Sequence, residues 1–152
     1  MRFTRAIVYA KSPYLLWARR FYGTVPFDLA ASGIPTVPRD LLGMPSSLEN
    51  PAAWNELRAA LAAYNDVRLD ECVVALGTSH ALWLAFASLV KPGDEVLLES
   101  PSYEPIELKA RAFGATVVRF ERAASEAYAL SPARIAKAMT RKTRVVVVTN
   151  LH

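Results

Sequence analysis

The sequence predicts an α/β fold, a three-layer α/β/α sandwich with a mainly parallel sheet. Short apolar runs alternate with longer segments whose apolar residues recur at helical spacing. Turns rich in glycine, proline and serine separate the two kinds of segment. Strands and helices that alternate along a chain are typical of a parallel sheet with helices on both faces. With 152 residues and 53% hydrophobic content, the chain is long and apolar enough for a core of this kind.

Residues 1–50 are expected to form an arm outside this alternation, and residues 51–152 to form the sheet and its helices. Pro35, Pro38 and Pro45 fall in the stretch "SGIPTVPRDLLGMPSSLEN", which therefore predicts a long loop that crosses a surface.

Each element after the arm has a local cause. Leu57 and Leu61 share one face at helical spacing. Gly114 is expected to end a helix, and Ser131 to cap the next one, with Pro132 at its first position. The predicted elements are, in order, a helix over 53–65, a strand over 71–76, a helix over 79–90, a strand over 95–100, a helix over 104–114, a strand over 115–121, a helix over 131–140 and a strand over 143–148.

The last predicted strand contains four consecutive valines, residues 145–148. A continuous apolar run of this kind is typical of a strand that is buried on both faces of a parallel sheet. Such a strand normally leads into a loop that carries a ligand and then into a crossover helix. We therefore expect the chain to be the first part of a longer domain.

Charge and composition argue against nucleic-acid and membrane partners. The 18 basic and 14 acidic residues give a net charge of +4, but the basic residues are scattered and lack interleaved aromatic residues. The longest apolar stretch, "ALWLAFASLV", is too short to span a bilayer, and no export signal is expected. The single cysteine, Cys72, lies in an apolar run and is expected to be a buried thiol, which fits a cytoplasmic protein.

Ligands bind parallel sheets at the carboxyl ends of the strands, and "GTSHA" follows the first predicted strand. Gly77 permits a tight turn, and Thr78 and Ser79 offer hydroxyl and N–H groups at a helix start, which favours a phosphate. The alternative is an ordinary helix cap by one of these hydroxyl groups. Because neither "GxGxxG" nor "GxxxxGK" occurs in the sequence, a monophosphate is a better candidate than a dinucleotide.

Tyr103 follows the next strand and stands between Pro101 and Pro105. A backbone restrained in this way can hold the tyrosine ring flat against a planar ligand. The alternative is a tyrosine at the rim that packs on a neighbouring helix. Taken together with "GTSHA", this position predicts a site for a flat, phosphorylated ring.

The segment "ALGTSHALWLAFASLVKPGDEVLLESPSYEPIELKARAFGATVVRF", followed by "SPARIAKAMTRKTRVVVVTNLH", resembles the class I and II aminotransferases. These are fold-type I enzymes that use pyridoxal 5′-phosphate. The resemblance runs from about Asp28 to His152 and rests on the order and spacing of "GTSHA", "KPGDEV", "PSY" and "VTN". In this family an "NPTG"-type loop follows the "VTN" strand, which agrees with the expectation of a longer domain.

The resemblance implies a role for each candidate residue. Gly77, Thr78 and Ser79 would hold the cofactor phosphate, and Tyr103 would stack on the pyridine ring. Gly33 in "DLAASGIP" would border the substrate carboxylate. The family's tyrosine and glycine before the helix at residue 53 are absent from "SSLENPAAW", so the resemblance supplies no phosphate contact from a second subunit.

The resemblance also implies an activity for the complete enzyme, which is amino-group transfer between an amino acid and a 2-oxo acid in a cytoplasmic homodimer. In this family the lysine that binds the cofactor covalently lies beyond the "NPTG" loop, and Asn150 would be structural. None of the five lysines has a matching motif, so this chain alone is expected to be inactive. The alternatives are another pyridoxal-phosphate reaction (decarboxylation, racemisation or carbon–sulfur cleavage) or a non-catalytic phosphate-binding or interaction protein.

Overall fold

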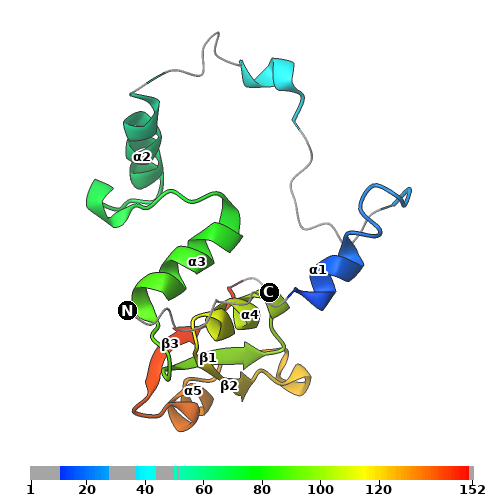
Figure 1. Ribbon diagram of the computed structural model, residues 1–152, viewed down its shortest axis with the longest axis vertical. Coiled ribbons are helices and arrows are strands. Elements are labelled where there is room, and N and C mark those ends of the chain that lie inside the picture. The colour runs from blue at the N-terminus through cyan, green and yellow to red at the C-terminus, as the bar shows by residue number, and fades with distance from the viewer. Residues whose placement is uncertain (1–10, 28–36, 44–49, 51, 151–152) are drawn as a thin grey trace, which may run out of the picture. The chain divides into compact units, whose positions relative to one another are not determined.

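The sheet contains, in the part of the chain that the structure describes, three parallel strands in the order β2-β1-β3 (Figure 1). This computed structural model describes residues 11–27, 37–43, 50 and 52–150. The strands are β1 Glu95–Ser100, β2 Thr116–Glu121 and β3 Thr143–Val147. β1 pairs with β2 as far as Ser100↔Glu121, and with β3 as far as Leu98↔Val147. All three strands therefore end at the same edge of the sheet, where parallel sheets bind ligands.

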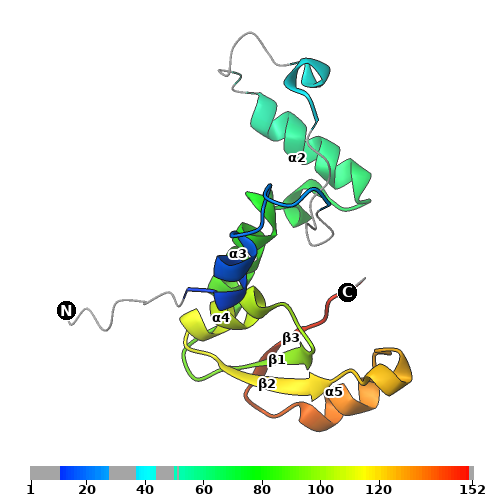
Figure 2. The same cartoon turned by 90° about the vertical axis from the view of Figure 1, so that its right-hand side faces the viewer.

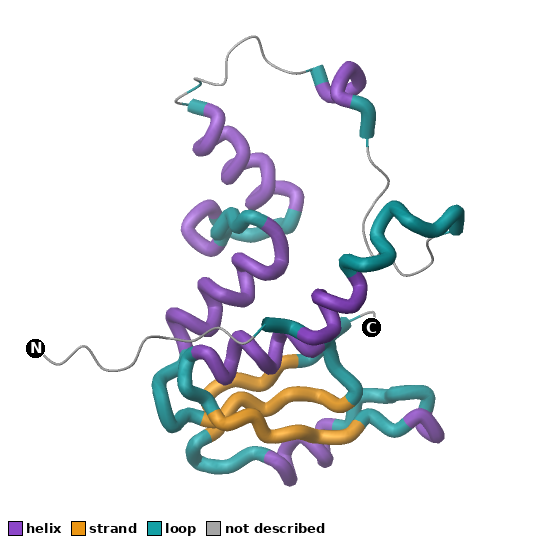
Figure 3. The backbone as a smooth tube through the Cα atoms, turned by 45° about the vertical axis from the view of Figure 1, so that its right-hand side comes forward, coloured by secondary structure: helices purple, strands orange, loops and turns teal. Residues whose placement is uncertain are grey.

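Helices cover both faces of this sheet, as the sequence predicts. α3 (Gly77–Leu89) and α4 (Glu104–Ala112) lie on one face, and α5 (Pro132–Ala138) lies on the other, which makes three layers (Figure 2 and Figure 3). An apolar core joins α3 and α4 to the sheet, and its burial is the main driving force for this packing. The buried members of this core are Phe86, Val90, Val96, Leu98, Ile106, Ala110 and Ala115.

Two predicted helix ends are confirmed. The Ser131 side chain caps α5 by accepting a hydrogen bond from Arg134 N at 3.3 Å, and Pro132 is the first residue of the helix. Gly114 follows α4 with a φ of 81°, a left-handed conformation that glycine adopts without strain. A Cβ atom on Gly114 would lie 3.1 Å from Pro92, so this helix end also fits closely against the turn that leads into β1.

Residues within 21–75 form a compact unit of their own, distinct from the unit formed by residues within 1–20 and 76–152. This smaller unit contains the 3-10 helices η1 (Arg39–Leu42) and η2 (Leu69–Glu71) and the helix α2 (Ala53–Tyr64). α2 confirms the helix predicted over 53–65. The boundary at residue 50 between an arm and a sheet-forming part stays a prediction.

The prediction of a strand over residues 71–76 is wrong. Residues 72–75 have no regular secondary structure, and Val73 and Leu76 are 76% and 88% exposed. An extended segment becomes a strand only when a neighbouring strand bonds its backbone, and none of the described strands pairs with this one. Cys72 is half-buried here, whereas a fully buried thiol was expected.

The prediction that the valine strand is buried on both faces is wrong for one of them. Val145 and Val147 pack against the core, but Val146 and Val148 are 38% and 41% exposed. Val146 pairs with Leu97, and on that face α5 packs against β2 and leaves the two valines uncovered. The apolar run therefore forms a strand with one buried face in the described part of the chain.

Among the described α-helices, one was not predicted from the sequence. α1 (Pro13–Ala18) begins after Ser12, whose hydroxyl group accepts a hydrogen bond from Leu15 N at 3.2 Å. The other predicted helices and strands are confirmed within a few residues at each end. No helix in the described ranges is both long enough and apolar enough to cross a membrane.

Candidate functional site

The carboxyl edge of the sheet is the candidate ligand site. Ser102 and Tyr103 follow β1, and Thr149 and Asn150 follow β3, so they come after two strands that are neighbours in the sheet. α3 leads through a short turn into the start of β1, and Figure 1 shows it inclined to the sheet, with its last turn nearer to the strands than its first. A helix that leads into a parallel strand usually begins on the side of the sheet where the strands end, so the turn at Gly77 belongs to the candidate site by topology.

The start of α3 presents two hydroxyl groups that have no hydrogen-bond partner in the described part of the chain. Gly77 has a φ of 76°, and Thr78 and Ser79 are exposed in the first turn. Neither hydroxyl group bonds to any described residue, and Leu76 before the helix gives no side-chain cap. The alternative in which Thr78 or Ser79 caps the helix is therefore not observed. Leu76 N donates to His80 Nδ1 at 3.0 Å, so His80 serves the helix start, and the first amides of α3 remain to bind an anion.

Tyr103 stands directly before α4 and is 38% exposed. Its ring lies edge-on to the ring of Tyr14 in α1. Glu104 holds α1 in this place, because its carboxylate accepts hydrogen bonds from Ser12 Oγ and from Tyr14 N, the latter at 3.0 Å. The contact with α1 agrees with the alternative interpretation, in which Tyr103 is a rim residue that packs on a helix. A planar ligand would stack on the part of the Tyr103 ring that remains exposed.

Two buried hydroxyl groups at the carboxyl edge of the sheet are also unpaired among the residues that the structure describes. Ser102 Oγ and Thr149 Oγ1 are buried without a hydrogen bond to any of the described residues. Buried polar atoms are nearly always bonded in native proteins, because an unpaired one costs about 1–3 kcal/mol. One group follows β1 and the other follows β3, so a ligand at this edge is the natural source of the missing bonds.

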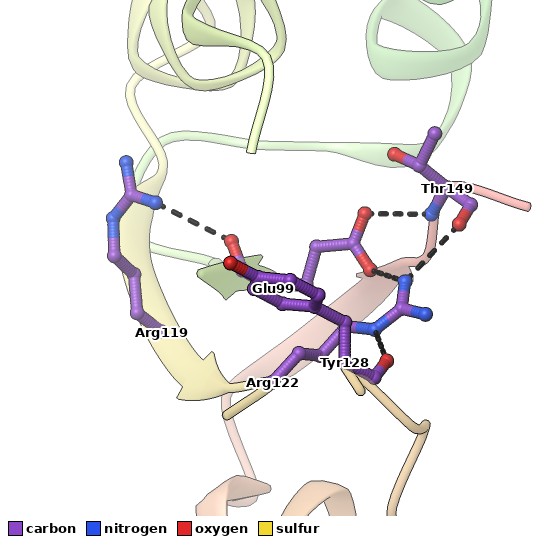
Figure 4. A network of polar contacts seen from close by, with 5 residues as sticks. All are labelled: Glu99, Arg119, Arg122, Tyr128 and Thr149. Carbon is purple, nitrogen blue, oxygen red and sulfur yellow. Dashed lines mark hydrogen bonds and ion pairs between the residues drawn. The ribbon is translucent and has the colours of Figure 1, made fainter. Parts of the chain in front are cut away.

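An ion pair between a fully buried carboxylate and a partly buried guanidinium joins the ends of the three strands (Figure 4). Glu99 in β1 is fully buried, and its carboxylate accepts hydrogen bonds from Arg122 Nη1 and from Thr149 N, both at 2.8 Å. Arg122, which follows β2, also donates to Thr149 O at 3.2 Å and to Tyr128 O at 2.6 Å. Arg119 Nη1 donates to the backbone oxygen of Glu99 at 3.3 Å. This network fixes the positions of the strand ends relative to one another.

Glu99 was not among the predicted site residues, although a carboxylate inside the apolar strand "EVLLES" is a signal that sequence reasoning could have used. Burial raises the pKa of Glu99, but the hydrogen bonds from Thr149 and Arg122 outweigh burial and lower the pKa below its ordinary value. Glu99 is therefore an ionised carboxylate at neutral pH, paired with the guanidinium of Arg122.

Several other candidate positions lie elsewhere. Gly33, which was expected to border the substrate carboxylate, lies outside the described residues. Lys91 and Lys142 precede β1 and β3 at the opposite edge of the sheet, and Lys109 and Lys137 lie on α4 and α5. Within the described ranges no group of three or more His, Cys, Asp or Glu side chains could hold a metal ion.

Known proteins are similar to this chain in sequence. The family model "Aminotransferase class I and II" matches residues 47–152. The aspartate/prephenate aminotransferase of Thermus thermophilus is 34% identical over 104 residues, which cover 64% of this chain and 27% of that protein. The histidinol-phosphate aminotransferase of Erythrobacter litoralis is 36% identical over 111 residues, which cover 73% of this chain and 29% of that protein.

Solved structures show the same architecture. A mutant aspartate aminotransferase of Thermus thermophilus superposes with a TM-score of 0.60 at 34% identity, over 61% of this chain and 26% of that chain. The aspartate aminotransferase of Thermotoga maritima gives 0.59 at 29% identity, over 71% and 30%.

The parallel sheet with helices on both faces is therefore that of the fold-type I aminotransferases. The chain belongs to the family of class I and II aminotransferases. It spans 26–30% of the length of the four relatives described above.

Proposed function

We propose that this chain supplies the phosphate and ring contacts of a pyridoxal 5′-phosphate site in an aminotransferase, which transfers an amino group between an amino acid and a 2-oxo acid. The observation that carries the proposal is the pair of buried hydroxyl groups of Ser102 and Thr149, which have no hydrogen-bond partner among the described residues and follow two neighbouring strands at the carboxyl edge of the sheet. The names of the relatives support the reaction class. When bound, the cofactor supplies an electron-withdrawing ring.

The start of α3 fits a phosphate group. A phosphate needs several donors, and the first turn offers the hydroxyl groups of Thr78 and Ser79 together with amides that have no partner inside the helix. The helix dipole adds about 0.3–1 kcal/mol in favour of an anion. The space around Gly77 is open, since a Cβ atom there would meet nothing within 4 Å. These residues would bind the phosphate and so anchor the cofactor.

Tyr103 would orient the ring of the cofactor. An aromatic pair contributes about 0.5–1.5 kcal/mol beyond the burial of its surface, so stacking gives pyridoxal phosphate a modest advantage over inorganic phosphate. The chain alone has no lysine with a matching motif for a covalent link. We therefore expect millimolar binding, which corresponds to about 4 kcal/mol.

The complete protein is proposed to be a cytoplasmic homodimer, with Gly33 beside the substrate carboxylate. Exposed apolar side chains on α2 support an interaction between subunits, because Trp54, Leu57 and Tyr64 are 54%, 46% and 88% exposed. Large apolar side chains exposed on one helix are common where a protein contacts a partner.

A titration of backbone amide shifts with inorganic phosphate and with pyridoxal phosphate tests the proposed cofactor site. We expect both ligands to shift the amides of residues 77–80 and to compete with each other. The double substitution Thr78→Ala, Ser79→Ala should raise the dissociation constants of both ligands at least threefold, which corresponds to about 0.7 kcal/mol. Ser131→Ala is the matched control, because it removes a hydroxyl group from another helix start. Shifts that cluster elsewhere, or that survive the double substitution, would overturn the proposal.

A further inference from the structure

The Glu99 carboxylate extends the pairing of β1 with β3 beyond the end of the strands. Backbone pairing of these strands ends at Leu98↔Val147. Two residues after Val147, Thr149 N donates to Glu99 Oε1 at 2.8 Å. The Glu99 side chain thus provides the hydrogen-bond acceptor for Thr149, beyond the point where the backbone of β1 pairs with β3.

Both backbone polar groups of Thr149 are held by this pair (Figure 4). Its N–H group bonds to Glu99, and its carbonyl oxygen accepts from Arg122 Nη1 at 3.2 Å. Arg122 is itself fixed by Glu99 Oε2 at 2.8 Å and by Tyr128 O at 2.6 Å. Because N–H and C=O point in different directions, two bonds to one residue set the orientation of its backbone as well as its position.

A contribution to stability does not by itself account for a charge at this position. The preceding residues of β1, Val96, Leu97 and Leu98, are apolar and fully buried. A buried ion pair loses the hydration of both ions, and apolar residues of similar volume often stabilise a fold equally well. The charged residue, Glu99, is the last buried residue of β1 before the ligand edge. This position indicates that its role is to fix the geometry of that edge.

We propose that Glu99 is a positioning residue for the cofactor ring, because through Arg122 it fixes the chain at the end of β3, beside the strand end that carries Tyr103. This inference rests on the proposed cofactor site. Glu99 acts through Thr149, whose buried hydroxyl group has no partner among the described residues and takes its direction from the same backbone. Ring binding should depend on Glu99, whereas phosphate binding should not, since none of these hydrogen bonds involves the start of α3.

Two variants and one control separate positioning from a general loss of structure. Glu99→Gln removes the charge and keeps the shape, and Arg122→Lys leaves the carboxylate in place but loses the planar guanidinium. Glu126→Gln is the matched control, because it disrupts the ion pair with Arg134 at 2.6 Å in the same unit. Each protein is assayed for hydrogen exchange at the Thr149 amide without ligand, and for the dissociation constants of pyridoxal phosphate and inorganic phosphate.

In Glu99→Gln we expect the Thr149 amide to exchange about tenfold faster, with a smaller change at Leu97. Pyridoxal phosphate should bind about three- to tenfold more weakly, while inorganic phosphate changes by less than about twofold. Arg122→Lys should act in the same direction, and Glu126→Gln should leave all three quantities within about twofold of wild type.

Unchanged exchange at Thr149 in Glu99→Gln would overturn the positioning role. Equal weakening of the two ligands would overturn it as well, because that result indicates a general loss of structure. A different result would show that the proposed cofactor site itself is wrong. In that case pyridoxal phosphate leaves the amides of residues 77–80 and Tyr103 of the wild-type chain unshifted, and the role of Glu99 toward the ring falls with it.

Discussion

The ring of Tyr14 lies edge-on to the ring of Tyr103, with 5.8 Å between the ring centroids and 83° between the ring planes. Glu104 accounts for this contact between distant parts of the sequence, because it accepts hydrogen bonds from Ser12 Oγ and Tyr14 N. An edge-to-face pair favours one orientation of both rings. α1 therefore helps to orient the tyrosine that we assign to the cofactor ring, although its sequence carries no recognisable motif.

Substitution of Tyr103 should change the preference for pyridoxal phosphate over inorganic phosphate. Tyr103→Leu removes the aromatic face and should reduce that preference about three- to tenfold, the equivalent of about 0.7–1.4 kcal/mol. Tyr103→Phe keeps the ring and should stay within about twofold of wild type. The ratio of the two dissociation constants from amide-shift titrations provides the measurement. An unchanged ratio in Tyr103→Leu would show that Tyr103 is a rim residue only.

Removal of the Glu104 carboxylate should release α1 from the sheet-containing unit. Glu104→Ala deletes the acceptor of two hydrogen bonds to Ser12 and Tyr14, so the helix should open more often. We expect trypsin to cleave after Arg19 or Arg20 about fivefold faster. Glu107→Ala is the control, since Glu107 lies on the same helix but pairs with Arg111 and Arg119. Equal cleavage rates in the two variants would contradict the role of Glu104.

Two glycine substitutions separate backbone strain from steric contact. Gly93 and Gly114 have φ values of 93° and 81°, so alanine at either position should lower the free energy of unfolding by about 1–2 kcal/mol. Only at Gly114 would the new Cβ atom also lie 3.1 Å from Pro92, which should cost about 1 kcal/mol more. Urea denaturation of Gly93→Ala and Gly114→Ala measures the difference. Equal losses would show that the turn at Pro92 moves aside.

Acid should remove the contribution of Glu99 to stability. Burial raises its pKa, but the hydrogen bonds from Thr149 and Arg122 prevail and hold the pKa below the ordinary value of 4.5. A carboxylate with a depressed folded-state pKa stabilises the fold fully above its unfolded-state pKa, and loses that contribution as the pH falls through the folded-state value.

The difference in free energy of unfolding between wild type and Glu99→Gln should therefore be constant from pH 7 to about 5.5 and shrink below about 4.5. At pH 7 we expect the variant to be less stable by about 1–3 kcal/mol. Urea denaturation at several pH values measures both quantities. A difference that grows on acidification would contradict the ionised state of Glu99.

Features with local causes could be predicted from the sequence. The helices follow from apolar spacing and from end signals such as Ser131 and Gly114, which act on adjacent backbone. The alternation of strands and helices also placed Tyr103 after a strand that the structure confirms as β1, whereas the strand predicted before Thr78 is absent from the described residues. The position of Tyr103 was enough to indicate the candidate edge before the arrangement of the sheet was known.

Features that depend on distant partners could not be predicted in this way. The segment 71–76 has the composition of a strand, but pairing requires a neighbour that no local pattern reveals. The exposed face of Val146 depends on where α5 packs. The contacts of Glu99 with Thr149 and of Tyr14 with Tyr103 join residues far apart in sequence, and only the folded topology brings them together.

Intermolecular nuclear Overhauser effects between pyridoxal phosphate and the wild-type chain test the cofactor site most directly. If the ring stacks on Tyr103 while the phosphate occupies the start of α3, the methyl and ring protons of the cofactor will give effects to the Tyr103 side chain, and the Thr78 and Ser79 amides will shift in the same sample. Inorganic phosphate should reproduce the shifts of Thr78 and Ser79 alone. A bound cofactor whose effects go to other residues, with the start of α3 unshifted, would contradict the assignment of this site.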